Sequence, residues 1–302
     1  MNPRERGFLL LTSHLGCPDR RVLTAAQLRT LARRVSAMER PLTDRELEAG
    51  DLLRLGYSRQ MAARILGLLQ EESLLEAYLH RGRSLGCVPV TRVSKDYPLI
   101  LRHRLGLDAP GCLWIRGELP ELQYGGIALV GSRDLNPENQ AFAQAVGRMA
   151  AQQGLPLISG NARGADRAAQ DACLEAGGRV ISVVADTLTG HSQRENLTYV
   201  SEDGFSEEFS AQRALSRNRV IHALGRIVFV AQCSLGTGGT WDGTTRNLRQ
   251  GWSPVACFRD GSPACRELEQ MGAYLVGLED LQELGALMQH TNPITIPGWE
   301  EE

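Results

Sequence analysis

The stretch GIALVGSR at residues 126–133 decides the fold class of this chain. An apolar run of about five residues has the length of a buried strand, and this one ends at a glycine where the backbone can turn sharply. The pattern recurs: LPLI at 155–158 runs into Ser159-Gly160, and further apolar runs cover 180–185, 227–231, 254–258 and 274–276.

Helical stretches lie between these runs. Asn136 and Pro137 are typical of a helix start, and further helices are predicted over 166–175, 214–224 and 245–249. Strands that are apolar throughout and alternate with helices predict a parallel sheet covered by helices on both faces, a Rossmann-like α/β fold. The run at 227–231 also suggests an apolar sheet edge at which two copies of the chain could meet.

Residues 1–85 follow a helical period instead, with Leu28, Leu31 and Val35 on one face of a first stretch and Ala62, Ile65 and Leu69 on another. We therefore expect three parts: a small all-helical domain over 1–85, the α/β domain over 86–278, and a helix with an acidic tail over 279–302. The tail region 261–302 has one basic and eight acidic residues.

The composition excludes several kinds of site. The net charge is −2, so any anion site must be a local cluster rather than a basic surface. Lys95 is the single lysine, which excludes a Walker A loop. The seven cysteines form no Cys-x-x-Cys pair, which argues for reduced thiols in a cytoplasmic protein without a zinc site or disulfide framework. We expect no signal peptide, no membrane span, no metal and no cofactor.

Four glycine- and arginine-rich segments carry the chemistry. Each alone has an ordinary explanation: a strand-to-helix turn, a helix N-cap for Asp166, a solvated basic turn at the start of a helix, or a flexible linker. Backbone N–H groups and arginines in such segments also suit a phosphate. The candidate binding residues are Gly131, Ser132 and Arg133; Ser159, Gly160, Arg163, Gly164 and Asp166; Arg217, Asn218 and Arg219; and Gly236, Thr237, Gly238, Gly239 and Thr240.

Because ligands bind parallel sheets at the carboxyl ends of the strands, these segments should converge. The sequence predicts one crevice surrounded by Arg133, Arg163, Arg217 and Arg219, suited to a phosphodiester backbone or a nucleotide. No catalytic pair stands out, and the six histidines are scattered.

The order of these motifs resembles the DNA-processing protein A (DprA/Smf) family. The resemblance is carried by Gly131-Ser132-Arg133, by Ser159-Gly160 with Ala162, Gly164 and Asp166, by Gly177-Gly178, by Arg217-Asn218-Arg219, and by the upstream segments Asp96-Tyr97-Pro98 and Trp114-Ile115-Arg116-Gly117. It implies a sterile-alpha-motif-like N-terminal domain, single-stranded DNA as ligand with Arg133 as a contact, a homodimer, and delivery of a RecA-type recombinase to DNA taken up in natural transformation.

Three features depart from the family pattern. Gln170 stands where the family usually has histidine, the segment 236–240 is richer in glycine, and we expect no C-terminal winged helix. The sequence thus predicts a non-enzymatic single-stranded DNA-binding recombination mediator. The alternative is a nucleotide sensor or nucleotide-cleaving enzyme on the related lysine-decarboxylase-like scaffold, although Asp242 replaces the glutamate that such hydrolases need. A protein that only makes protein contacts is a third reading.

Overall fold

A computed structural model describes residues 1–38, 47–118, 122–202 and 204–283. Its centre is a nine-stranded sheet in the order β1-β2-β6-β5-β4-β3-β7-β8-β9. Each adjacent pair from β6 to β9 in this order is parallel, whereas β1 pairs antiparallel with β2 and β2 pairs antiparallel with β6. The strands are β1 Cys87–Thr91, β2 Cys112–Arg116, β3 Gly126–Val130, β4 Leu157–Ser159, β5 Val180–Val183, β6 Leu197–Ser201, β7 Gly225–Val230, β8 Val255–Phe258 and β9 Tyr274–Val276.

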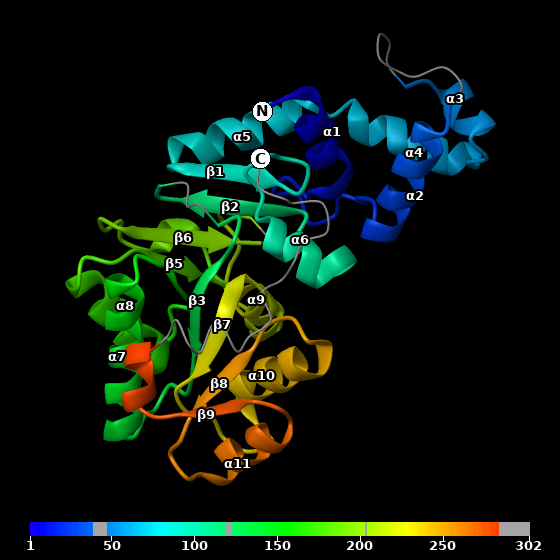
Figure 1. Cartoon of the computed structure of the whole chain (residues 1–302). Coiled ribbons are helices and arrows are strands. Elements are labelled where there is room, and N and C mark those ends of the chain that lie inside the picture. Colours follow the sequence, from blue (N-terminus) through cyan, green and yellow to red (C-terminus); the bar gives the residue numbers. More distant parts are fainter. Residues whose placement is uncertain (39–46, 119–121, 203, 284–302) are drawn as a thin grey trace, which may run out of the picture.

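Helices cover both faces of the sheet, which confirms the predicted Rossmann-like fold class (Figure 1). The helices are α1 Pro3–Thr12, α2 Ala25–Ser36, α3 Ala49–Arg54, α4 Arg59–Leu69, α5 Glu72–Ser84, α6 Leu99–Leu105, α7 Pro137–Gln152, α8 Ala165–Glu175, α9 Ala211–Leu224, α10 Gly238–Gln250 and α11 Pro263–Gln270, with short 3-10 turns at Gly106–Asp108, Leu188–Gly190 and Glu279–Glu283.

The central strand β3 shows why the apolar runs are continuous. Ile127 and Leu129 belong to the core on the α7 and α8 side, whereas Ala128 and Val130 belong to the core on the α9 side. Successive residues of a strand point to opposite faces, so a strand buried on both faces must be apolar at every position. Strand β8, whose four residues Val255–Phe258 are all apolar and buried, follows the same rule.

Three strands were not predicted from the sequence: β1, β2 and β6. Strand β6 contains buried Thr198 and Ser201, and β1 contains Pro89, so neither has an uninterrupted apolar run. Pairing with neighbours decides these strands, because β2 pairs antiparallel with both β1 and β6. The predicted sheet edge at 227–231 is wrong, since β7 lies between β3 and β8.

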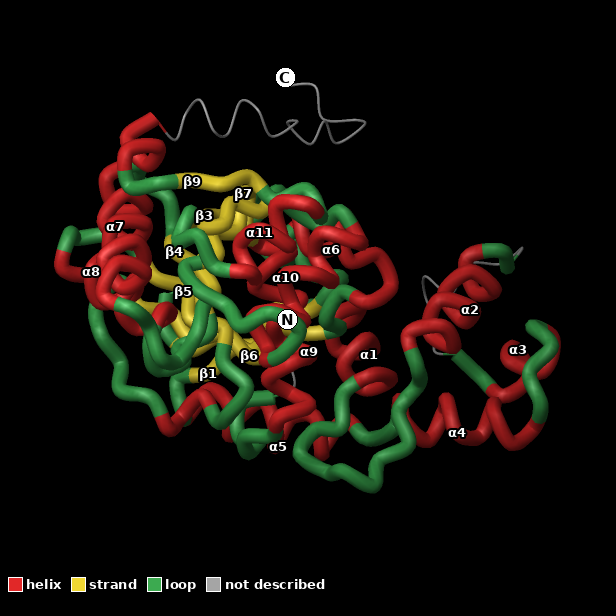
Figure 2. Tube along the Cα trace, turned by 90° about the horizontal axis from the view of Figure 1, so that it is seen from below, coloured by secondary structure: helices red, strands yellow, loops and turns green. Residues whose placement is uncertain are grey.

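The N-terminal helices fall into two groups (Figure 2). Helices α1 and α5 pack against the sheet, and Tyr78 of α5 makes an edge contact with Trp114 of β2 at a centroid distance of 5.2 Å. Helices α2, α3 and α4 form a separate small core around Leu31, Leu52 and Ile65, to one side of the sheet.

The expected domain boundaries stay a prediction. The change from helices to strands occurs between Ser84 and Cys87, close to the expected boundary, although α1 and α5 share the core of the sheet. The expected C-terminal helix and acidic tail lie outside the described residues from 284 onward. Within the described ranges, no helix is both long and apolar enough to span a membrane.

Candidate phosphate-binding crevice

A crevice of 490 Å³ opens at the carboxyl ends of β3 and β7, between the loop after β3, the face of α9 and the first turn of α10. Most of the predicted residues meet there, so the expected convergence is confirmed for them. Those that line the crevice are Gly131, Ser132, Arg133, Asp166, Arg217, Asn218, Thr237, Gly238, Gly239 and Thr240.

The loop after β3 is fixed by close packing. A Cβ at Gly131 would overlap the Cβ of Ala165, so only glycine fits where this loop passes the start of α8. The Ser132 N–H donates to the Gln232 carbonyl at 2.8 Å, and the Ser132 carbonyl accepts from the Ala165 N–H at 3.1 Å. Arg133 then projects at the mouth of the crevice, exposed and without an ion-pair partner among the described residues.

Asp166 holds the loop after β4 from within. One of its carboxylate oxygens accepts from the N–H groups of Gly160 at 3.0 Å and Ala162 at 3.1 Å. Burial raises the pKa of this carboxyl, while the nearby Arg217 and these two N–H groups act in the opposite direction. The expected N-cap role is wrong: α8 begins at Ala165 with Gly164 as its N-cap, at a φ of +89° that favours glycine.

Arg217 forms a wall of the crevice. It lies in the middle of α9 rather than at a helix start, and 8% of it is exposed. One of its terminal nitrogens donates to the Val183 carbonyl at 2.9 Å, and its Nε has no partner in the described part of the chain. Burial lowers the pKa of the guanidinium, and the Asp166 carboxylate counteracts that shift. A largely buried guanidinium on the wall of an open crevice is suited to an anion.

The first turn of α10 supplies backbone donors. The end of the predicted loop 236–240 belongs to this helix, which begins at Gly238. Thr237 is the N-cap residue, and its side chain makes no capping hydrogen bond. Thr240 Oγ1 donates to the Gly131 carbonyl at 3.0 Å, and Asn218 Nδ2 donates to the Gly239 carbonyl at 3.1 Å. No backbone hydrogen bond within the described ranges uses the N–H groups of Gly238 and Gly239. Together with the helix dipole, such free N–H groups attract a phosphate.

The structure places two of the four predicted arginines outside the crevice. Arg163 is paired with Asp134 at 2.7 Å on the surface, and Arg219 is paired with Glu202 at 2.6 Å in a nearly buried ion pair. The prediction of one crevice ringed by four arginines is therefore wrong for these two. Spacing after a strand could not reveal which carboxylate each side chain would meet.

Four further predicted residues do not line the crevice. Ser159 is fully buried and accepts from Gln170 Nε2 at 2.6 Å, so it is closed to a ligand. Gly160 lies beneath Arg217, and Gly164 lies against the carbonyls of Ser132 and Arg133. Gly236 is not among the lining residues. Gln170, which departs from the family pattern, also reaches Ser182 Oγ at 3.3 Å and so has a packing role.

Sequence reasoning missed the apolar wall and floor. Phe209, Leu215 and His222 line the crevice, and Phe209 and Leu215 are exposed by 58% and 46%. A signal was present: Leu215, Asn218 and His222 are three and then four residues apart, which puts them on one face of a helix. The helix predicted over 214–224 already contains these residues, but the sequence does not show that this face lines the crevice.

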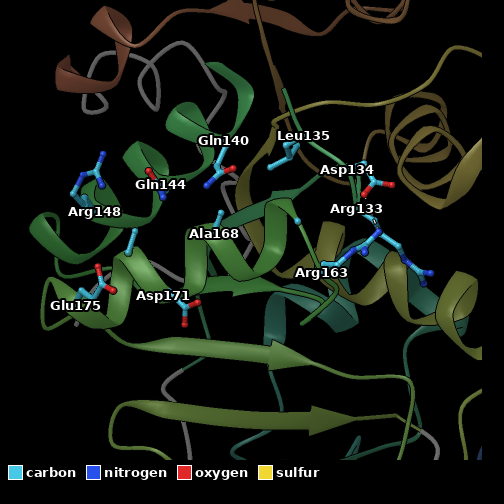
Figure 3. A pocket seen from close by; sticks show the side chains of 12 residues that line it. Arg133, Asp134, Leu135, Gln140, Gln144, Arg148, Arg163, Ala168, Asp171 and Glu175 are labelled. Carbon is cyan, nitrogen blue, oxygen red and sulfur yellow. Dashed lines mark hydrogen bonds and ion pairs between the residues drawn. The ribbon is translucent and has the colours of Figure 1, made fainter. Parts of the chain in front are cut away.

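A second groove, of 840 Å³, lies between α7 and α8 and shares Arg133 with the crevice (Figure 3). It adds Arg148 and Arg163, but Asp134, Asp171 and Glu175 line it as well, so the charges cancel. Figure 3 shows Arg148 and Glu175 at the end of the groove remote from Arg133. This balance makes the groove a weaker anion site than the crevice. Among the described residues, no three His, Cys, Asp or Glu side chains are grouped to hold a metal ion.

The model of the family "DNA recombination-mediator protein A" matches residues 89–286, a range that contains every part of the crevice and all of the sheet except the first two residues of β1. The chain belongs to this family. It is 30% identical over 247 residues to the DNA processing protein DprA of Streptococcus pneumoniae, a match covering 77% of this chain and 85% of that protein.

Solved structures of the family share this fold. The X-ray structure of DprA from Streptococcus pneumoniae matches with a TM-score of 0.70 at 24% identity, covering 93% of this chain and 98% of that one. DNA processing protein A from Helicobacter pylori, solved to describe its single-stranded DNA binding mode, matches with a TM-score of 0.54 at 21% identity, covering 68% of this chain and 97% of that one. The predicted membership of the DprA/Smf family is thus confirmed.

Proposed function

We propose that this recombination mediator binds single-stranded DNA through contacts between the crevice and the phosphodiester backbone. The observation that carries the proposal is the meeting of Arg133, Arg217 and the free N–H groups at the start of α10 around one opening. These donors recognise phosphate and contact no base edge, so the binding is tolerant of sequence. The single-stranded DNA binding described for the Helicobacter pylori relative supports the same ligand class.

Fluorescence anisotropy of a labelled single strand, measured against the purified chain at two salt concentrations, tests this function. Arg133→Ala removes the exposed, unpaired cation, and we expect weaker binding to every sequence and a salt slope reduced by about one. Arg83→Ala is the matched control, because Arg83 lies on α5 away from the crevice and its side chain is 60% exposed. Equal affinities for all three proteins would overturn the proposal.

We also propose that the crevice is not a hydrolytic site. Asp166 is the one carboxylate among its lining residues, and it already accepts from two backbone N–H groups. Glu202, an acidic residue that lies shortly before α9 in the chain, forms an ion pair with Arg219. A hydrolase requires a carboxylate free to activate water. Incubation with nucleotides and analysis of the products tests this point, and turnover that Asp166→Asn abolishes would contradict it.

A free-nucleotide sensor is the second candidate, favoured by the apolar side chains that line part of the crevice. It predicts that a nucleoside phosphate raises Tm without DNA.

The wider role implied by the family is also part of the proposal: a cytoplasmic homodimer that delivers a RecA-type recombinase in natural transformation. Light scattering tests the dimer, and recombinase filament assembly on protected single strands tests the delivery.

A further inference from the structure

The unit formed by α2, α3 and α4 carries an excess of positive charge that the rest of the chain does not share. Residues 17–70, called the three-helix unit below, contain ten arginines and six acidic residues, although the whole chain has a net charge of −2. Figure 2 shows the three helices grouped to one side of the sheet. None of their residues lines the crevice. The unit therefore presents a basic surface separate from the proposed DNA site.

Most of these arginines are not neutralised by neighbouring carboxylates. Arg20 forms an ion pair with Glu71, and Arg54 is paired with Asp51. The other arginines in the described part of the unit make no ion pair with a described residue; they are Arg21, Arg29, Arg33, Arg34, Arg59 and Arg64. Unpaired guanidinium groups at a surface are suited to bidentate hydrogen bonds with phosphate oxygens.

Two of the unpaired arginines meet at the turn between α3 and α4. Gly56 in this turn has a φ of +81°, a conformation that glycine adopts without strain. Arg34 of α2 packs on the turn: its guanidinium carbon lies 4.6 Å from the centre of the Tyr57 ring, and its Nη1 would lie 3.8 Å from a Cβ at residue 56. Arg59 is the first residue of α4 and is exposed. One cation from α2 and one from α4 thus lie at the same turn.

Backbone donors accompany these two cations. Ser58 is the N-cap residue of α4, and its hydroxyl accepts from the Met61 N–H at 3.2 Å. The N–H groups of Arg59 and Gln60 have no acceptor among the residues that the structure describes. Free N–H groups at the positive end of a helix add to the attraction of a phosphate. Every helix start has such groups, so it is the arginines beside them that distinguish this one.

The surface suits a duplex rather than a single strand. Tyr57 is the one aromatic residue in the three-helix unit. The Arg34 guanidinium lies over its ring, and its hydroxyl is buried. Proteins hold single strands by stacking unpaired bases on aromatic rings as well as by phosphate contacts. The bases of a duplex are already stacked on each other, and its two backbones carry one negative charge per about 1.7 Å. A basic surface without an open aromatic ring therefore fits double-stranded DNA.

We propose that the three-helix unit binds the backbone of double-stranded DNA at the turn between α3 and α4, with Arg34 and Arg59 as phosphate contacts. The inference goes beyond the proposed function, because the crevice takes no part in this binding. A protein with both sites holds a single strand in the crevice and a duplex on the three-helix unit, as at a junction between single-stranded and double-stranded DNA. Contacts to phosphates alone make the duplex binding tolerant of sequence.

Fluorescence anisotropy with two labelled ligands separates the two sites. One ligand is a short blunt-ended duplex, and the other is a single-stranded hexanucleotide. Arg59→Glu is the decisive variant, since a glutamate in the first turn of a helix is favourable for folding but repels phosphate. We expect about tenfold weaker binding to the duplex and a salt slope reduced by about one. Affinity for the hexanucleotide should not change.

Three further variants serve as controls. Arg266→Glu makes the same exchange at an exposed residue near the start of α11, outside both sites, and should bind the duplex as wild type does. Arg34→Gln removes the second cation and should also weaken duplex binding, whereas Arg34→Lys keeps the charge and should retain most of it. A thermal unfolding curve of each variant shows whether the three-helix unit is still folded.

Several results would overturn the duplex site. An equal loss in Arg59→Glu and Arg266→Glu would assign the effect to net charge alone. Failure of wild type to bind the duplex at low salt would remove the site altogether. Duplex binding that Arg133→Ala abolishes and Arg59→Glu leaves unchanged would place the duplex in the crevice. If wild type binds the duplex but not the hexanucleotide, the proposed function fails while the duplex site stands.

Discussion

The guanidinium of Arg217 lies directly over the backbone of Gly160, in the space that a Cβ at residue 160 would fill. Arg217 comes from the middle of α9 and Gly160 from the end of β4, and Arg217 also donates to the Val183 carbonyl at the end of β5. One side chain therefore joins a helix to the carboxyl ends of two neighbouring strands. The wall of the crevice depends on this contact.

Gly160→Ala tests the contact. The new methyl group overlaps the Arg217 guanidinium and must push it away from the Val183 carbonyl. We expect a loss of about 1–3 kcal/mol in the free energy of unfolding, as for other overpacked sites, together with weaker DNA binding. Urea unfolding and anisotropy measure the two effects. Gly67→Ala is the control, because nothing lies within 4 Å of that position on α4, and it should leave DNA binding unchanged.

Asp166 is expected to be essential for the shape of the loop after β4. Asp166→Ala leaves the N–H groups of Gly160 and Ala162 without their acceptor, so we expect a loss of about 2–4 kcal/mol in the free energy of unfolding. Asp166→Asn keeps an acceptor oxygen and should lose less. Urea unfolding of both variants measures this order, and the reverse order would show that the charge opposite Arg217 matters more than the two hydrogen bonds.

The two arginines outside the crevice should differ in their effect on stability. Arg219→Ala leaves the Glu202 carboxylate, 5% exposed, without its ion-pair partner, and we expect a loss of about 3–5 kcal/mol in the free energy of unfolding. Arg163→Ala breaks a pair whose side chains are 76% and 85% exposed, and we expect no measurable change. Chemical denaturation of the two variants side by side checks the contrast, which equal losses would refute.

His222 should make the protein sensitive to acid. Burial lowers its pKa to about 3 from an ordinary 6.5, so the folded state favours the neutral ring. The stability from this group is complete above pH 6.5 and is lost as the pH falls toward 3, by about 1.4 kcal/mol per pH unit. Between pH 7 and 4.5, wild type should therefore lose about 2–3 kcal/mol more than His222→Phe. Denaturation curves at several pH values measure the difference, with His80→Phe as the control; parallel curves for wild type and His222→Phe would contradict it.

The amino-acid sequence alone predicted the fold class, the parallel strands β3, β4, β5, β7, β8 and β9, and most residues of the crevice. The reason is local. A strand buried on both faces must be apolar throughout, as GIALV is, and the glycines and arginines that follow such strands are brought to one edge by the parallel arrangement. Arg133, Asp166, Arg217 and the segment 237–240 could therefore be placed together before the fold was known.

The exact boundaries of the helices and the partners of the polar side chains could be determined only from the tertiary structure. The sequence predicted a helix from Ala214, whereas α9 begins at Ala211. The predicted helix already placed Leu215, Asn218 and His222 on one face, but only the packing of α9 shows that this face lines the crevice. Strands β1 and β6 were missed because neither has an uninterrupted apolar run, and β2 was missed although it begins with four apolar residues. Pairing with neighbouring strands gives all three their place in the sheet.

The amino-acid pattern alone identified the strands and helices that alternate along the chain, because burial on both faces imposes that pattern locally. The partner of each polar side chain is visible only in the folded chain. Arg163 binds Asp134, Arg219 binds Glu202, and the side chain of His222 binds nothing within the described residues. These outcomes depend on contacts between segments that are far apart in the chain, and the spacing of residues along the sequence does not show which of these contacts form.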